Sequence, residues 1–133
     1  MKGLRQMTLG ELAAYVCSHL ESRNIRVVLS GGACVAIYAS GRYVSMDLDF
    51  IDRLQTTRRH LKQALAEIGF SEKNRYFVHP ETEFFLEFPS GPLAVGNEPV
   101  REIEDLHLET GTLRLLSPTD CVKDRLAAFY HWK

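Results

Sequence analysis

The sequence lacks any apolar run long enough to cross a membrane. Its longest uninterrupted apolar segment, residues 33–39, falls far short of the roughly 20 residues that a membrane-spanning helix needs. The first residues, Met1 to Gln6, carry charge but are not followed by the apolar stretch of a secretory signal peptide. We therefore expect a cytoplasmic protein with no membrane association.

Cysteine is scarce, and neither sign of charge is in excess. The cysteines Cys17, Cys34 and Cys121 show no C-x-x-C spacing and no histidine at zinc-ligand spacing, which argues against a disulfide framework or a zinc site. The 16 basic and 17 acidic residues leave a formal net charge of −1. This balance argues against a protein that coats nucleic acid through bulk charge.

What is present is enough for one folded domain. The chain has 133 residues, 45% of them hydrophobic and 25% charged, a composition typical of a globular core and not of disorder. The helical spacing of Leu126, Phe129 and Tyr130 is unfinished at Lys133. We expect a single domain over residues 1–133 whose last helix can continue in a longer natural chain.

Hydrophobic periodicity and turn residues predict an α+β domain. Thr8 and Glu11 form a capping box at the start of the first helix, and Ser117 caps the last helix. The predicted helices span residues 9–23, 33–39 and 57–69, with a last one after Ser117, and the predicted strands span residues 25–29, 46–51, 75–78, 83–88, 103–108 and 112–116.

Ser30, Gly31 and Gly32 lie between a predicted strand and a predicted helix. A glycine pair at this place lets backbone N–H groups approach an anion, and the helix dipole favours negative charge there. Phosphate is the anion that this turn predicts. The alternative is a simple loop with no ligand.

Asp47 and Asp49 share one face of a predicted strand, whereas Leu48 and Phe50 point to the other. The two carboxylates stand about 6.6 Å apart along the strand at roughly 3.3 Å per residue. Such a pair can hold Mg²⁺, which prefers oxygen ligands and often shares them with substrate phosphate. The alternative is a solvated strand end.

The order of these features resembles the nucleotidyltransferase superfamily that includes DNA polymerase β. The resemblance is closer to the AbiEii-type toxins and related small bacterial nucleotidyltransferases, which read Gly-Gly, a small residue, a short helix, and then Arg and Ser or Thr ahead of Asp-Leu-Asp. The matching residues here are Gly31, Gly32, Ala33, Arg42, Ser45, Asp47, Leu48, Asp49 and Phe50. The segment 118–126 is similar to the family's later helix, which presents a lysine, here Lys123, toward the nucleotide.

The resemblance implies a nucleotidyltransferase fold, with a small twisted mixed β-sheet and helices packed mainly on one face. It implies that Asp47, Asp49 and a third carboxylate bind two Mg²⁺ ions, for which Mn²⁺ can substitute. Glu87 is our choice for the third carboxylate, because it is a lone acid in an apolar strand, and Glu83 is the alternative on the same face. The residues implied to bind the nucleotide are Ser30, Gly31, Gly32, Arg42, Ser45 and Lys123.

Some of these residues also have simpler interpretations. Arg42 can pair with a surface carboxylate, Ser45 can bond the backbone at a loop end, and Lys123 can lie on a solvated helix face. Glu87 can be an exposed residue on an edge strand. The basic stretch of Arg53, Arg58, Arg59 and Lys62 predicts either a solvated helix face or a local contact for RNA or an acidic partner.

The function implied is Mg²⁺-dependent transfer of an NMP from an NTP to a hydroxyl of RNA or protein. Some members of the family act as toxins paired with an antitoxin, so an antitoxin is an expected partner. The alternative function is a binding or regulatory module that keeps the nucleotidyltransferase fold without turnover.

Overall fold

The computed structural model describes residues 3–39, 44–89, 94–95, 98–99 and 102–124. Its helices are η1 (Leu4–Gln6), α1 (Leu9–Ser22), α2 (Gly31–Tyr38) and α3 (Arg58–Ala66), and residues 118–124 are also helical. Its strands are β1 (Val27–Ser30), β2 (Asp47–Asp52), β3 (Ser71–Lys73), β4 (Tyr76–His79), β5 (Thr82–Glu87), β6 (Ala94–Val95), β7 (Glu98–Pro99), β8 (Ile103–Leu108) and β9 (Gly111–Leu116).

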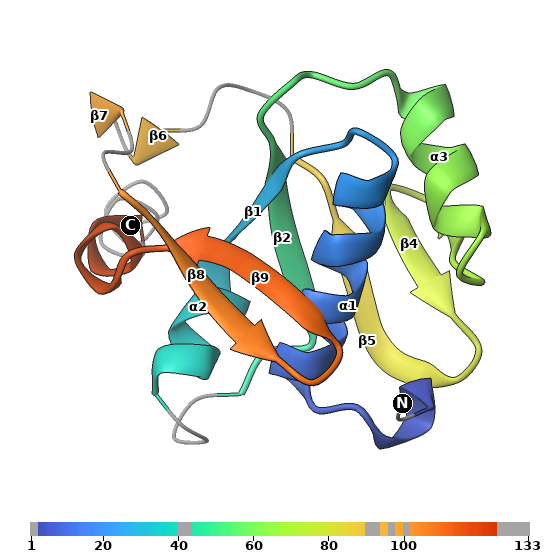
Figure 1. Ribbon diagram of the computed structural model, residues 1–133, viewed down its shortest axis with the longest axis horizontal. Coiled ribbons are helices and arrows are strands. Elements are labelled where there is room, and N and C mark those ends of the chain that lie inside the picture. The colour runs from blue at the N-terminus through green and yellow to red at the C-terminus, as the bar shows by residue number, and fades with distance from the viewer. Residues whose placement is uncertain (1–2, 40–43, 90–93, 96–97, 100–101, 125–133) are drawn as a thin grey trace.

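Seven of these strands form one mixed sheet in the order β3-β4-β5-β2-β1-β9-β8 (Figure 1). Strand β2 runs antiparallel to β1 and parallel to β5, and β1 runs parallel to β9. The short strands β6 and β7 form a separate pair. The predicted α+β class with a mixed sheet is therefore confirmed.

Helix α1 forms where the capping box predicts it. The Thr8 hydroxyl accepts a hydrogen bond from the Glu11 N–H at 3.2 Å, and the Glu11 carboxylate accepts one from the Thr8 N–H at 3.0 Å. Its apolar face, including Leu12, Val16 and Leu20, is fully buried. Helices α1 and α3 contact each other and lie on the same side of the sheet (Figure 1).

The centre of the sheet is buried, and this fixes the direction of the acidic side chains. All four residues of β1 are buried. In β2 the exposed fraction of Leu48 and Phe50 is 0%, whereas Asp47 and Asp49 are half-buried on the opposite face. The predicted alternation of a core face and a carboxylate face is confirmed.

The short elements η1, β6 and β7 were not predicted, and three further features differ from the sequence prediction. Helix α2 begins at Gly31, so the glycine pair forms its first turn instead of preceding it. Helix α3 ends at Ala66, and the chain then turns through Gly69, whose φ is +92°. Strand β3 has a polar sequence that gave no hydrophobic period, and its pairing with β4 forms it.

The helix predicted after Ser117 is present as far as the structure describes it. The Ser117 hydroxyl accepts a hydrogen bond from the Asp120 N–H at 3.2 Å, as an N-cap does. Its predicted continuation past residue 124 lies outside the described residues. None of the described helices has the length and hydropathy that crossing a membrane would require.

Candidate active site

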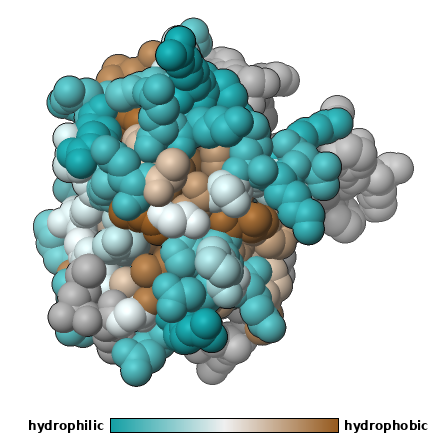
Figure 2. Space-filling view, turned by 90° about the vertical axis from the view of Figure 1, so that its right-hand side faces the viewer, coloured by the Kyte–Doolittle hydropathy of each residue, from teal (hydrophilic) through white to brown (hydrophobic). Residues whose placement is uncertain are grey.

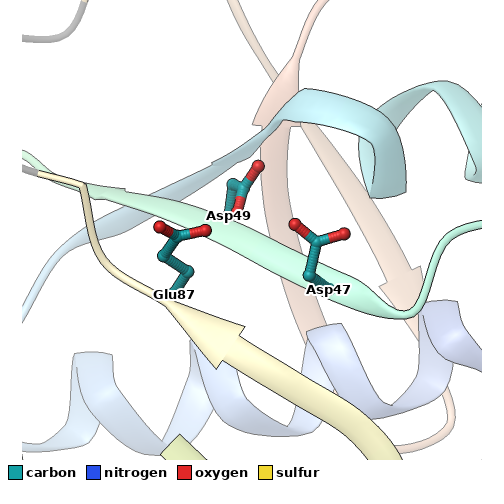
Figure 3. A group of neighbouring side chains, drawn as sticks. All are labelled: Asp47, Asp49 and Glu87. Carbon is teal, nitrogen blue, oxygen red and sulfur yellow. The ribbon is translucent and has the colours of Figure 1, made fainter. Parts of the chain in front are cut away.

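Three carboxylates from two neighbouring strands meet at one place. Asp47 and Asp49 come from β2 and Glu87 comes from β5, and the parallel register sets Glu87 directly opposite Asp49. One carboxylate oxygen from each residue lies within 4.8 Å of the others (Figure 3). Oxygens on opposite sides of one Mg²⁺ lie about 4.2 Å apart, so the cluster has about the width of a divalent-cation site.

The electrostatics of Asp49 favour a nearby cation. Burial and, to a lesser extent, the neighbouring charges of Asp47 and Glu87 together raise the pKa of Asp49 to about 8. Its Oδ1 atom is buried and has no hydrogen-bond partner among the described residues. The ion pairs between described residues include none of the three carboxylates. A hard divalent cation fits this oxygen set, because it would satisfy the orphaned atom and favour the ionised form.

Ser45 orients Asp47. Its hydroxyl lies 3.2 Å from Asp47 Oδ1 and 3.1 Å from the Asp47 main-chain carbonyl, and it can donate to either oxygen. Both the carboxylate and the strand start are therefore held by one side chain. A nucleotide contact of Ser45 itself stays a prediction.

The turn between β1 and α2 is held against the same cluster. Gly31 has φ +66°, and a Cβ built on it would overlap the Asp49 carboxylate. The Ser30 hydroxyl donates to the main-chain carbonyl of Asp49 at 3.2 Å. Glycine is therefore required at position 31 both by its backbone conformation and by the closeness of Asp49.

The Gly31 N–H already has an anionic partner. It donates a hydrogen bond to Asp124 Oδ2 at 3.0 Å. The first glycine amide predicted for phosphate is therefore bonded to a carboxylate of the last helix. Sequence reasoning missed Asp124, since nothing in the sequence alone brings residue 124 next to residue 31.

The other predicted site residues are not gathered so closely. Glu83 is exposed, and the pairing of Phe85 with Asp47 sets Glu83 beyond the start of β2, so Glu87 is the residue that joins the cluster. Lys123 has an exposed side chain next to Asp124 in the sequence. Arg42 lies outside the described residues.

An open cleft of about 580 Å³ adjoins Glu87. Its wall includes Arg58, whose guanidinium bonds Glu72 at 2.8 Å and lies 4.6 Å from the centre of the Phe77 ring. Figure 2 shows the face that carries α3, where hydrophilic residues surround a band of hydrophobic ones. The residues that line the cleft are Arg58, Glu72, Asn74, Arg75, Glu87, Phe88 and Pro89.

Comparison with solved structures identifies the fold. The solution structure of the antibiotic-resistance factor ANT(2'')-Ia matches with a TM-score of 0.50 and 14% identity, over 92% of this chain and 83% of that chain. The fold is that of a nucleotidyltransferase. A crystal structure of ANT(2'')-Ia in complex with adenylyl-2''-tobramycin gives a TM-score of 0.48 at 15% identity, over 88% of this chain and 86% of that chain.

Sequence comparison adds no family. No protein-family model and no curated protein matches the chain. The structural match to ANT(2'')-Ia confirms the predicted nucleotidyltransferase fold. The closer resemblance to AbiEii-type toxins stays a prediction.

Proposed function

We propose that this protein is a metal-dependent nucleotidyltransferase that moves an NMP from an NTP to a hydroxyl group. The observation that carries the proposal is the cluster of Asp47, Asp49 and Glu87 with its orphaned buried oxygen. The glycine turn lies against this cluster, as a site for phosphates and metal together requires. The fold supports this chemistry without identifying the substrates.

In this proposal Asp47 and Asp49 would hold two Mg²⁺ ions, or Mn²⁺ in their place, and Glu87 would complete the set of ligands. When bound, these ions would lower the pKa of the attacking hydroxyl and stabilise the pyrophosphate leaving group. Ser45 keeps the Asp47 carboxylate in one orientation. The oxygen of the acceptor hydroxyl forms a bond to the α-phosphorus while the bond from that phosphorus to pyrophosphate breaks. Glu87 accepts the proton that the hydroxyl loses in this step.

The nucleotide and the acceptor approach from different sides. The triphosphate lies on the side of Ser30, Gly31 and Gly32, with Lys123 and Arg42 as further contacts. The acceptor lies in the cleft beside Glu87, where Arg75 provides positive charge next to the ion pair of Arg58 with Glu72. This charge favours RNA over protein as the acceptor, because phosphates bind arginine readily.

The wider role of the protein extends the same proposal. A single cytoplasmic domain that acts as a toxin, held in check by an antitoxin, is consistent with the sequence resemblance. The transfer assay below decides the acceptor class on which this role depends.

The experiment is incubation of the protein with each labelled NTP, Mg²⁺ and either total RNA or cell lysate. The matched control is the double variant Asp47→Asn with Asp49→Asn, which keeps the side-chain shape and removes both charges. We expect label on RNA with the wild type and none with the variant. Label on protein would show that the acceptor is protein instead of RNA. No label with any NTP would contradict the proposal.

A second candidate is a binding or regulatory module that keeps the nucleotidyltransferase fold without turnover. The bonded Gly31 N–H favours it, because a carboxylate stands where a phosphate was predicted. An NTP with Mg²⁺ would then leave the melting temperature of the wild type unchanged, and no transfer would occur with RNA or protein. Transfer above the level of the double variant would exclude this candidate.

A further inference from the structure

We infer that Asp124 is a positioning residue of this site and acts through Gly31 on Asp49. The inference rests on the proposed function for its catalytic consequence, although the contact itself does not. Asp124 is not a member of the three-carboxylate cluster and, in our proposal, does not meet the reacting atoms. Its effect comes from where it holds the first residue of α2.

Gly31 lies between two carboxylates. On one side its N–H donates to Asp124 at 3.0 Å. On the other side its Cα faces the Asp49 carboxylate so closely that no Cβ fits. The φ of +66° at Gly31 allows both contacts at once, so a shift of the Gly31 peptide would also change the space around Asp49.

The last helix is docked so that Asp124 can make this contact. Residues 117, 120, 121 and 124 follow the spacing of one helix face, and Ser117, Asp120 and Cys121 are buried, whereas Val122 is 59% exposed. Asp124 thus lies on the face that packs inward. The Cys121 thiol is a hydrogen-bond partner of Cys34 in α2 and raises the pKa of Cys34.

A second set of contacts fixes the end of β9, just before this helix, to α2. The carbonyl of Leu116 accepts hydrogen bonds from the Tyr38 hydroxyl at 2.7 Å and from the Cys34 thiol at 3.7 Å. The Asp124 bond to Gly31 then joins the two helices at the other end of α2. The end of β9 and the last helix that follows it therefore hold α2 at both of its ends.

In this arrangement Gly31 and Gly32 have different roles. Gly31 serves the close approach to Asp49, and its N–H is committed to Asp124. Helix α2 has no side-chain cap at Ser30, so phosphate binding falls to Gly32 and the amides after it. The opposite interpretation is that Asp124 is a substitute anion, which an incoming phosphate displaces.

The test compares Asp124→Asn with Asp124→Ala. Asparagine keeps an oxygen that can accept from the Gly31 N–H, and alanine does not. Glu109→Ala, which removes an exposed acid from the turn between β8 and β9, is the control for the loss of one negative charge. The readouts are hydrogen exchange of the Gly31 amide, Mn²⁺ affinity, and kcat and KM for transfer.

We expect Asp124→Ala to expose the Gly31 amide to exchange, to weaken Mn²⁺ binding several-fold, and to lower kcat roughly 10- to 100-fold with a smaller change in KM. Asp124→Asn should restore all three readouts to near the wild-type values. Glu109→Ala should change none of them.

Three results would overturn the inference. Tighter NTP binding in Asp124→Ala would show that Asp124 competes with phosphate. Failure of Asp124→Asn to restore Mn²⁺ affinity, with the Gly31 amide protected, would show that charge matters instead of position. An unprotected Gly31 amide with unchanged Mn²⁺ affinity would break the link to Asp49. If the wild type transfers no nucleotide, the proposed function fails, and amide exchange and Mn²⁺ binding still test the positioning role.

Discussion

The two sides of the site differ in how their polar groups are satisfied. On the carboxylate side, Asp47, Asp49 and Glu87 lie together, and the Asp49 Oδ1 atom is buried with no partner among the described residues. On the glycine side, the Gly31 N–H bonds Asp124 and the Ser30 hydroxyl bonds the Asp49 carbonyl. One side is left with unmatched negative charge, and the other is already bonded.

This difference indicates which side depends on a ligand. Like charges at short range in a half-buried place cost free energy that only a cation or a proton can offset. The Gly31 N–H and the Ser30 hydroxyl have no such demand, since their hydrogen bonds are made within the chain. We therefore expect metal to change the stability of the protein, and we expect changes in the glycine turn to act through its geometry.

The largest effect should come from removing the charges of the carboxylate side. Asp47→Asn with Asp49→Asn should lower the transfer rate by roughly 10³-fold or more, since bound metal contributes several kcal/mol to such a reaction. The same variant should raise the metal-free melting temperature, because the repulsion is gone. Calorimetry in EDTA and the transfer assay measure the two effects. A lower metal-free melting temperature would contradict the charge argument.

The next effect concerns the glycine side. Gly31→Ala should cost about 1–2 kcal/mol from the left-handed backbone alone, and more from overlap with the Asp49 carboxylate. Gly10→Ala is the matched control, because a Cβ there meets Leu108 at an ordinary 3.6 Å within a helix. That change should be neutral or stabilising. Denaturant unfolding of both variants checks the difference, and equal stability would mean that position 31 needs no glycine.

Local patterns predicted much of this site. The alternation of Asp47 and Asp49 with buried neighbours and the capping box of α1 follow from residues close in the chain. Glu87 is predicted as a site residue because it is a lone acid in an apolar strand, and the parallel pairing of β5 with β2 sets it opposite Asp49. The structure brings Glu87 together with Asp47 and Asp49, and its catalytic role stays a prediction.

What the sequence did not predict depends on tertiary packing. Strand β3 is polar and forms because β4 offers it a partner edge. The bond from Gly31 to Asp124 joins residues 93 positions apart, and no periodicity connects them. The sequence therefore predicts a phosphate contact for the Gly31 N–H without indicating that Asp124 competes for it.

The pH dependence of stability separates the two sides further. The pKa of Asp49 rises from its ordinary value of 3.8 to about 8 in the folded chain. The folded state therefore binds more protons than the unfolded state between these values, and metal-free stability should fall as the pH rises from about 4 to 8. Saturating Mg²⁺ should reduce this slope, because it favours the ionised carboxylate.

Melting curves measured across this pH range, in EDTA and in Mg²⁺, check the slope. Asp49→Asn provides the control, since it cannot ionise, and its curve should be flatter in EDTA than that of the wild type. A wild-type curve that fell no more steeply between pH 4 and pH 8 than the Asp49→Asn curve would contradict the raised pKa of Asp49.

The smallest effect compares two serines that hold opposite sides of the site. Ser45→Ala removes the hydroxyl beside Asp47 Oδ1 and should weaken Mn²⁺ binding about 2- to 10-fold, the equivalent of a hydrogen bond of about 0.5–1.5 kcal/mol. Ser30→Ala removes a bond to a main-chain carbonyl, so it should lower stability by a similar free energy and change Mn²⁺ affinity less. Titration with Mn²⁺ measures the metal affinity of both variants, and denaturant unfolding measures their stability. If Ser30→Ala weakened Mn²⁺ binding more than Ser45→Ala, the Ser30 bond to the Asp49 carbonyl would matter more to the metal site than the Ser45 contact with Asp47, and the division between a ligand-dependent side and a bonded side would fail.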